Sequence, residues 1–140
     1  MTFWQWFQSL FSPPAPTPAP KPAPVPHPES AMLDALNSAR AANRCVPLMP
    51  DAGLDLIAGS RAAKMARTGI LSHNGYEHEV ADHYPRQATS ECIAEGQKTA
   101  TEVVRDWMNH PHNLEIVLGR FNWVGCGHRD GFWCCDFLSA

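Results

Sequence analysis

Proline is distributed very unevenly along this 140-residue chain. Nine of its thirteen prolines fall within residues 12–28, SPPAPTPAPKPAPVPHP, where proline stands at nearly every second position. Proline fixes φ and has no backbone N–H to donate, so this run favours an extended polyproline-type spacer over a helix, a sheet or a core. The run therefore divides the chain into an N-terminal segment at 1–11, a linker at 12–28 and a folded domain at 29–140.

The segment before the linker, FWQWFQSLF at residues 3–11, is aromatic and amphipathic. At about 100° per residue its apolar side chains share one side of a helix, with Gln5, Gln8 and Ser9 on the other. The first basic residue is Lys21, so the positive start of an ordinary signal peptide is missing, and a degenerate export signal or a terminus without a role is one interpretation. The other is an anchor, and a polar face without basic residues favours a protein groove over an anionic membrane.

Charge balance and cysteine content limit what the chain binds and where it works. Eleven basic against fourteen acidic side chains leave a net charge of −3, which gives no support for capture of nucleic acid. No apolar run reaches the roughly 20 residues needed to cross a bilayer. Five cysteines in so short a chain favour an oxidising compartment, and the absence of a Cys-x-x-Cys pair argues against a structural zinc knuckle.

Hydrophobic periodicity within the domain predicts several helices. Ser30, Asp51 and Thr99 are suited to begin three of them as N-caps, and Gly69 is suited to end the second. The predicted helices lie at residues 30–43, 51–68, 99–108 and 111–118. Residues 75–89 show no period and are predicted to form a loop, whereas SECIA at 90–94 is predicted to be a buried strand.

The C-terminal part of the chain carries a strong hairpin signal, Asp130-Gly131 between two apolar runs. A two-residue loop there makes the numbers of facing residues sum to 261, which places Cys126 opposite Cys135. Opposed cysteines are close enough to form a disulfide; unbridged, they would be small core residues. The order of elements predicts an α+β fold, with a small, mainly antiparallel sheet that ends in the hairpin and has helices on both faces.

Several stretches, taken in order, resemble the CAP superfamily, which comprises the cysteine-rich secretory, antigen 5 and pathogenesis-related proteins. The resemblance is to the compact bacterial form of this SCP-like domain, and it extends over about residues 31–138. The stretches are LNSARAAN, AAKMARTGILSH, SECIAEG, VVRDWMNHPHNLEIVL and VGCGHRDGFWCCDF. The resemblance implies a three-layer α/β/α sandwich.

The resemblance also implies a ligand cleft. In this family the histidine of Ser-His, the glutamate of Gly-Glu-Asn and a second histidine line one cleft, so His73 and Glu91 stand at two of these places. An ungapped match puts Asn113 at the second-histidine position, a one-residue slip puts His112 there, and His110 is a substitute. Two imidazoles and a carboxylate can hold zinc or another divalent cation with open coordination positions, and they can equally bind a polar head group.

Three functions are consistent with such a cleft. The first is a non-catalytic binding domain for a divalent metal, held by His73 with His112 or His110, or for a lipid or other small ligand. Residues 1–28 would then tether the domain to a protein partner, a surface or an assembly. The second is a metal-assisted hydrolase of peptide or cell-wall material, with Glu91 as general base. The third is a structural or decoration protein of a virion or cell surface, in which the cleft is vestigial.

The sequence favours the first function over an enzyme. Neither Gly-x-Ser-x-Gly nor His-Glu-x-x-His occurs, so no nucleophile stands with its base in a recognisable motif. The cysteine content and the resemblance favour an extracellular, virion-associated or surface-associated location. We therefore expect a secreted or surface-tethered binding domain.

Overall fold

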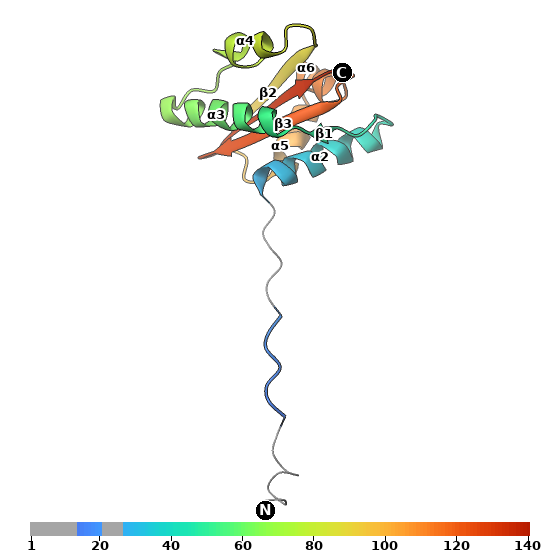
Figure 1. Ribbon diagram of the computed structural model, residues 1–140, viewed down its shortest axis with the longest axis vertical. Helices are drawn as coiled ribbons and strands as arrows, with labels where there is room; N and C mark the ends of the chain where they lie inside the picture. Colours follow the sequence, from blue (N-terminus) through green and yellow to red (C-terminus); the bar gives the residue numbers. More distant parts are fainter. Residues whose placement is uncertain (1–13, 21–26) are drawn as a thin grey trace, which may run out of the picture.

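A four-stranded sheet lies at the centre of the domain, with its strands in the order β1-β3-β4-β2 (Figure 1). The structure is a computed structural model, and it describes residues 14–20 and 27–140. The strands are β1 Met49–Pro50, β2 Thr89–Glu95, β3 Trp123–Arg129 and β4 Phe132–Leu138. β2 and β3 each pair antiparallel with β4, whereas the short β1 joins β3 in parallel. The mainly antiparallel sheet predicted from the sequence is confirmed.

The β3–β4 hairpin has the predicted register. Its turn residues, Asp130 and Gly131, have φ angles of 48° and 83°. Positive φ at both central residues is typical of the two-residue turn whose twist matches that of the flanking strands. Cys126 accordingly faces Cys135 across the hairpin.

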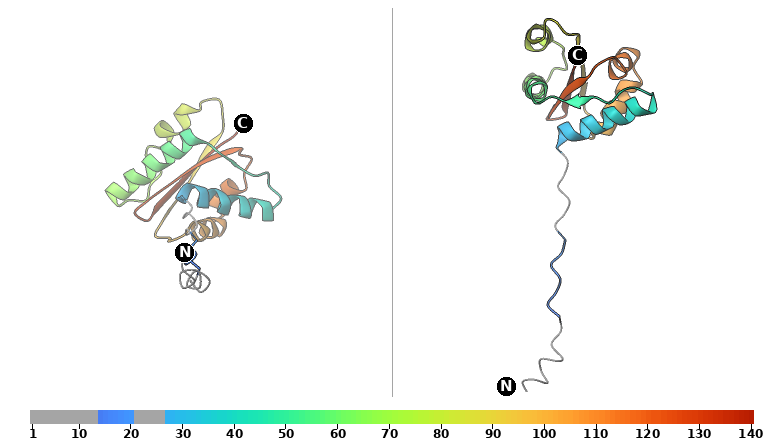
Figure 2. Two further views of the ribbon diagram at one scale, coloured as in Figure 1. Left: turned by 60° about the horizontal axis from the view of Figure 1, so that its bottom comes forward. Right: turned by 45° about the vertical axis from the view of Figure 1, so that its right-hand side comes forward.

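Helices cover both faces of the sheet. They are α2 Pro28–Ala42, α3 Ala52–Thr68, α4 Tyr76–Glu79, α5 Ala100–Met108 and α6 Pro111–Val117, with a 3-10 turn, η1, at Ala81–His83. Figure 2 shows α3 and α4 on one face and α2, α5 and α6 on the other. The predicted three-layer α/β/α sandwich is therefore confirmed.

Helix α3 begins and ends where the sequence predicts. The Asp51 side chain accepts a hydrogen bond from the Leu54 N–H at 2.8 Å, which caps the first turn. Gly69 ends the helix in the left-handed conformation, φ 69°, and its N–H donates to the Met65 carbonyl. Thr99 caps α5 in the same way as Asp51 caps α3.

Two predictions of secondary structure are wrong. Helix α2 begins at Pro28 rather than after Ser30, and His27 stands at its N-cap position. Proline has the φ angle of a first helical turn and lacks the N–H that would go unpaired there, so it can begin the helix earlier. Residues 75–89, predicted to form a loop, contain α4 and η1, which are too short to show a helical period.

Helix α3 packs directly on the backbone of strand β3, because glycine occupies the contact points. A Cβ atom added to Gly125 would lie 2.0 Å from the Leu54 carbonyl carbon, and one added to Gly127 would lie 2.5 Å from the Gly59 Cα atom. No side chain fits at these positions, so helix and strand approach until their backbones are in contact. This contact sets the place of α3 against the sheet.

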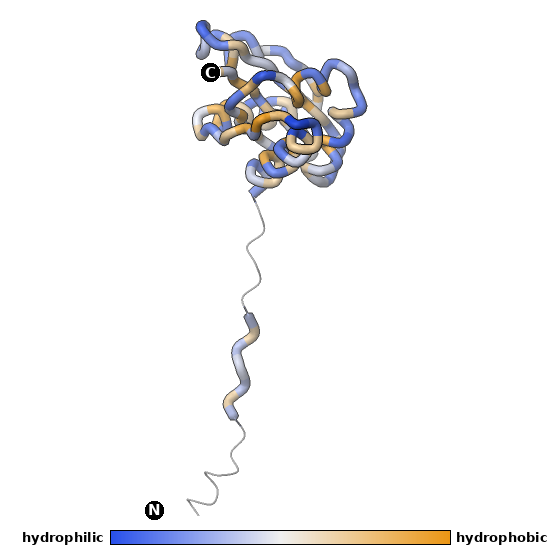
Figure 3. The backbone as a smooth tube through the Cα atoms, turned by 90° about the vertical axis from the view of Figure 1, so that its right-hand side faces the viewer, coloured by the Kyte–Doolittle hydropathy of each residue, from blue (hydrophilic) through white to orange (hydrophobic). Residues whose placement is uncertain are grey.

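The sheet separates two apolar clusters. The larger cluster lies between the sheet and the layer of α2, α5 and α6, and it includes Leu36, Trp107 and Val117. The smaller lies beneath α3 and includes Ala62 and Cys134. In Figure 3 the hydrophobic residues gather within the domain, and hydrophilic residues follow the outer loops.

The region before the domain is described only in part. Residues 14–20 are exposed and belong to no helix or strand. The aromatic segment 1–11 and the remaining linker positions 12, 13 and 21–26 lie outside the described residues, so their predicted roles stay predictions. None of the helices described in the structure combines the length and the apolar character that a membrane crossing requires.

Candidate functional site

A buried ion pair joins helix α3 to strand β2. Arg61 lies on the side of α3 that faces the sheet, and Glu91 lies on β2; each side chain is only 1% exposed. The Arg61 Nη2 atom donates to Glu91 Oε1 at 2.8 Å, and Nε donates to Oε2. Both carboxylate oxygens of Glu91 therefore accept from one guanidinium, which is the strong two-point form of this interaction.

The same guanidinium also holds the segment that follows α3. Arg61 Nη1 donates to Glu79 Oε2 of α4 at 2.6 Å and to the Asn74 carbonyl at 3.3 Å. Lys64, one turn along α3, contacts the other oxygen of Glu79 at 3.2 Å. Arg61 thus links α3, β2, the loop after α3 and α4 at one point.

His73 lies in that loop and contacts the ion pair. Its Nδ1 atom lies 2.9 Å from Glu91 Oε1, within hydrogen-bonding distance. The His73 side chain is 54% exposed, whereas Glu91 is buried beneath it. The structure therefore brings together the two residues that the family resemblance placed in a cleft, with the imidazole at the surface and the carboxylate behind it.

Two residues of β4 lie next to Glu91. The Cys134 Sγ atom lies 3.4 Å from Glu91 Oε2 and 3.7 Å from Asp136 Oδ2. Asp136 is fully buried, and its Oδ1 atom has no hydrogen-bond partner. An acid in such a place is expected to keep its proton, because an unpaired buried charge is costly.

Burial and neighbours move the two carboxyl groups in opposite directions. Burial alone would raise the pKa of Glu91, but hydrogen bonds from His73 and Arg61 outweigh it and lower this pKa to about 2. Burial, together with the hydrogen bond to the ionised Glu91, holds the pKa of Asp136 well above its usual value. The pair therefore consists of a carboxylate at Glu91 and a protonated acid at Asp136.

His110, His112 and Asn113 do not join this site. They lie at the start of α6, and His110 and His112 are exposed. Helix α6 packs against the larger apolar cluster, whereas Glu91 points to the opposite face of the sheet, towards α3. The expected combination of His73 with a histidine of the 110–113 corner is not formed, because the sheet lies between them.

The Glu91 carboxylate, one of the ligands that the predicted zinc would need, is already engaged. Both oxygens of Glu91 accept from Arg61, and the Nδ1 atom of His73 lies against Glu91, so His73 can offer only its Nε2 atom to a metal. Glu91, Cys134 and Asp136 each offer a ligand atom within 4.8 Å of the others. A divalent cation at that point would nevertheless have to displace the guanidinium of Arg61, which already neutralises the carboxylate.

Sequence reasoning missed three residues of the site, Arg61, Cys134 and Asp136. Arg61 interrupts an apolar helix stripe that otherwise contains Ala58, Ala62 and Met65, and Asp136 interrupts the apolar strand FWCCDFL. A charged residue on a face that packs inward requires a buried partner, so both positions carried a detectable signal.

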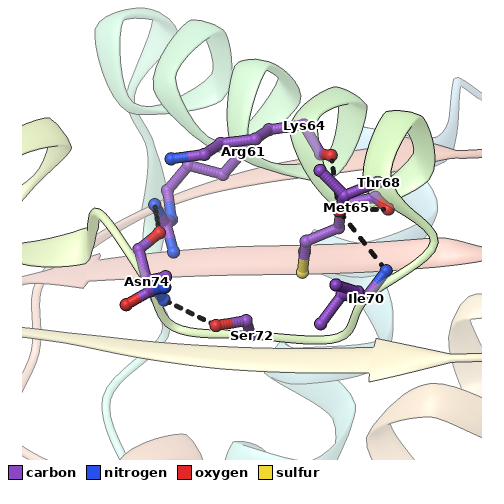
Figure 4. A pocket seen from close by; sticks show the side chains of 7 residues that line it. All are labelled: Arg61, Lys64, Met65, Thr68, Ile70, Ser72 and Asn74. Carbon is purple, nitrogen blue, oxygen red and sulfur yellow. Dashed lines mark hydrogen bonds between the residues drawn. The ribbon is translucent and has the colours of Figure 1, made fainter.

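Two hollows lie beside the loop that follows α3, one between this loop and α3 and the other along residues 72–78; we call the two together the α3-loop groove. The smaller hollow, about 130 Å³, is lined by Arg61, Lys64, Met65, Thr68, Ile70, Ser72 and Asn74 (Figure 4). The larger, about 490 Å³, is lined by residues 72–78 and is mostly polar. The two hollows have the lining residues Ser72 and Asn74 in common.

Comparison with known proteins identifies the fold of the chain. The model of the cysteine-rich secretory protein family, CAP, matches residues 33–137. No curated protein sequence matches the chain.

Three solved structures share the fold. An extracellular protein containing an SCP domain, from Bacillus anthracis, has a TM-score of 0.72 and 18% identity over 80% of this chain and 40% of that one. A cysteine-rich secretory protein from Staphylococcus aureus has a TM-score of 0.69 and 14% identity over 78% of this chain and 37% of that one. An outer surface protein from Borrelia burgdorferi has a TM-score of 0.68 and 18% identity over 77% of this chain and 89% of that one. The match thus spans well under half of the first two proteins and most of the third.

Proposed function

This chain belongs to the cysteine-rich secretory protein (CAP) family, and on that premise we propose that its domain is a non-catalytic binding module. The ligand we propose is a small amphiphile with a polar or acidic head, bound in the α3-loop groove beside His73. The observation that carries the proposal is the position of His73, which contacts the buried Glu91 through Nδ1 while its ring stands 54% exposed. His73 lines the larger, polar hollow, its neighbours Ser72 and Asn74 also line the smaller, apolar one, and a few fixed polar groups beside apolar surface are typical of ligand sites.

The two hollows of the groove differ in chemistry, which supports an amphiphilic ligand. Met65 and Ile70 give the smaller hollow an apolar lining (Figure 4). The larger hollow contains His73 and His78, and its lining is mostly polar. An apolar chain against Met65 and a head group near His73 would occupy both hollows at once.

The state of Glu91 supports binding over hydrolysis. A general base works best with a pKa near the working pH and a free lone pair directed at the substrate. Both Glu91 oxygens accept from Arg61, and the pKa of Glu91 is lowered to about 2. Glu91 is therefore better suited to orient the His73 ring than to remove a proton from water.

Binding can be tested with decanoate, a simple anionic amphiphile, by following backbone amide shifts of the full-length chain. We expect saturable shifts confined to residues 61–78. We also expect His73→Ala to weaken binding by roughly tenfold, equivalent to one charge-assisted hydrogen bond of about 1.4 kcal/mol. His83→Ala is the matched control, because His83 is exposed and outside both hollows. Equal affinity for wild type and His73→Ala would remove the proposal.

We further propose that residues 1–28 tether the domain to a protein partner or surface. The solved structures from Bacillus anthracis and Borrelia burgdorferi are described as an extracellular and an outer surface protein, which supports a location outside the cell. Replacing Trp4 and Trp6 by alanine should release the chain from a surface or particle fraction without changing decanoate binding. Attachment that depends on these residues, combined with no ligand binding at all, would instead favour the decoration protein with a vestigial cleft.

A further inference from the structure

Three cysteines form one row across the three long strands of the sheet. Cys92 of β2 faces Cys135 of β4, and Cys135 in turn faces Cys126 of β3. All three are buried in the larger apolar cluster, so their side chains share one face of the sheet. Cys126 and Cys135 form a disulfide, whereas Cys92 is a free thiol. The central Cys135 therefore has a cysteine on each side.

The backbone hydrogen bonding of β3 shows what kind of antiparallel pair Cys126 and Cys135 form. The Cys126 N–H donates to the Asp55 side chain at 2.9 Å and so does not point to β4, and the Cα atoms of Cys126 and Cys135 are 4.2 Å apart. Both features mark a non-hydrogen-bonded antiparallel pair.

The backbone N–H and C=O of Cys135 must then point to the other neighbour, β2, which makes Cys92 and Cys135 a hydrogen-bonded pair. The Cα atoms of such a pair lie about 5.5 Å apart, near the commonest separation for a disulfide.

We propose that Cys92 is a second disulfide partner of Cys135, reached by thiol–disulfide exchange within the sheet. The Cys92 thiolate attacks the Cys135 sulfur and forms a new S–S bond as the Cys126–Cys135 bond breaks. The bonding pair leaves on the Cys126 sulfur, which takes up a proton in place of the one that Cys92 lost. The chain holds one disulfide and three thiols before and after the step, so no oxidant is consumed.

The row suits this exchange better than any other arrangement of thiols in the chain. Displacement at sulfur requires the entering and leaving sulfurs on opposite sides of the central one, and Cys92 and Cys126 flank Cys135 in that way. Cys134 is adjacent to Cys135 in sequence but points to the other face, towards Glu91. Cys45 is not on a strand of the sheet; its Sγ atom lies 3.7 Å from the Leu118 carbonyl oxygen, just after α6.

The exchange would change what the disulfide holds together. The Cys126–Cys135 bond links two strands that a tight turn already joins, with a sequence separation of 9. A Cys92–Cys135 bond would instead link the edge strand β2 to β4. Because Glu91 precedes Cys92 on β2, the second bond would fix the strand that carries the carboxylate of the candidate site. Burial, followed by the nearby carboxyls of Glu91 and Asp136, raises the pKa of Cys92, so exchange should be slow and should accelerate with pH.

The wild-type, full-length chain tests the exchange without added reagents. It is held at about pH 7 and about pH 9, under conditions in which circular dichroism reports the native fold, and is then quenched with acid. Free thiols are alkylated, and linked peptides are identified by mass spectrometry. We expect a Cys92–Cys135 peptide beside the Cys126–Cys135 one, with a several-fold larger share at the higher pH. Detection of Cys126–Cys135 alone at both pH values would overturn the proposal, as would pairing of Cys135 with Cys45 or Cys134.

A variant tests the choice of partner independently. Cys126→Ser removes the observed partner, and oxidised glutathione supplies the oxidant for a new bond. We expect folded Cys126→Ser protein to form Cys92–Cys135, and an added Cys134→Ser change to leave this bond in place. The Cys92→Ser/Cys126→Ser double variant should leave Cys135 as a thiol or glutathione adduct. If Cys135 is found only as a thiol or a glutathione adduct in folded Cys126→Ser protein, the proposal is contradicted.

Discussion

Arg61 and Glu91 form a buried two-point ion pair that joins helix α3 to strand β2. The pair stands behind His73, and Arg61 also holds Glu79 of the following helix. The arrangement of the candidate site therefore depends on one guanidinium that connects four segments of the chain.

Removing either member of this pair should destabilise the fold. Arg61→Leu leaves the Glu91 carboxylate buried without its cation, and we expect a loss of about 3–5 kcal/mol in the free energy of unfolding. Glu91→Gln leaves Arg61 paired with Glu79, so its loss should be smaller. Urea unfolding measures this loss. Lys64→Gln is the control, because Lys64 is 42% exposed and its contact with Glu79 should contribute less than about 1 kcal/mol. Equal losses for Lys64→Gln and Arg61→Leu would show that the buried pair has no special weight.

Acid should weaken the contribution of Glu91. Its pKa is about 2 in the folded protein and about 4.3 in an unfolded chain, so its stabilising effect is present above pH 4.3 and is lost as the pH falls towards 2. The difference in unfolding free energy between wild type and Glu91→Gln should therefore shrink over this window. Urea titrations at a series of pH values provide the measurement, and a difference that stays constant with pH would contradict the ionised state of Glu91.

Asp136 should have the opposite effect. Its folded pKa is raised, so the protonated form favours folding at low pH, and this contribution is lost as the pH rises above the unfolded value of about 3.9 through the folded pKa. Asp136→Asn removes the ionisation while keeping the size of the side chain. We expect the variant to gain stability relative to wild type as the pH rises, which thermal unfolding between acidic and alkaline buffers can detect. A relative stability that falls with rising pH would show that Asp136 is charged in the folded protein.

Two glycine substitutions should act in opposite directions at the interface of α3 and β3. In Gly125→Ala the new methyl group would overlap the α3 backbone at Leu54, and we expect a loss of at least about 1–3 kcal/mol. A Cβ atom at Gly59 meets nothing within 4 Å, so Gly59→Ala in the helix interior should stabilise the fold by about 0.5–1 kcal/mol. Melting temperatures of the two variants are compared with wild type. A neutral Gly125→Ala would mean that the helix is free to move away from the strand.

Zinc binding should not depend on His73. His73 can offer only its Nε2 atom, and the Glu91 carboxylate is held by Arg61. The histidines at 110 and 112 lie on the layer beyond the sheet, so none of the other predicted ligands is free beside His73. Isothermal titration of zinc should therefore give the same heats for wild type and His73→Ala. A clear loss of heat in His73→Ala would restore the metal site predicted from the sequence.

The parts of the fold that follow from the sequence are those with a local chemical cause. The Asp130-Gly131 turn determines the register of its hairpin, and Asp51 and Gly69 mark both ends of α3 through capping. Strand β1, only Met49–Pro50, was missed because two residues show no alternation and their partner, β3, is distant in the sequence. Short elements of this kind form only because the larger ones bring them together.

In the candidate site, too, only the residues on or next to a clearly predicted element could be placed from the sequence. The contact between His73 and Glu91 agrees with the resemblance, because one follows a well-defined helix and the other lies on a clear strand. The placement of His110 and His112 could not be derived, since a seven-residue helix such as α6 does not reveal which side of a sheet it covers. Arg61 lies within an apolar helix stripe, and its charge at that position was the one sign in the sequence that it has a buried partner.

The glycine contacts between α3 and β3 fix the position of α3, which forms one side of the smaller hollow. The helix cannot move closer to the sheet, because backbone already meets backbone, and it cannot move away without separating Arg61 from Glu91. Because Arg61 and Glu91 also hold Asn74 and His73, a molecule too large for the smaller hollow would have to be accommodated by the exposed residues 69–71 at the start of the loop. If the groove binds the proposed amphiphile, the choice of ligand would depend on that short loop, and mutations there would change the ligand while α3 and the sheet stay as they are.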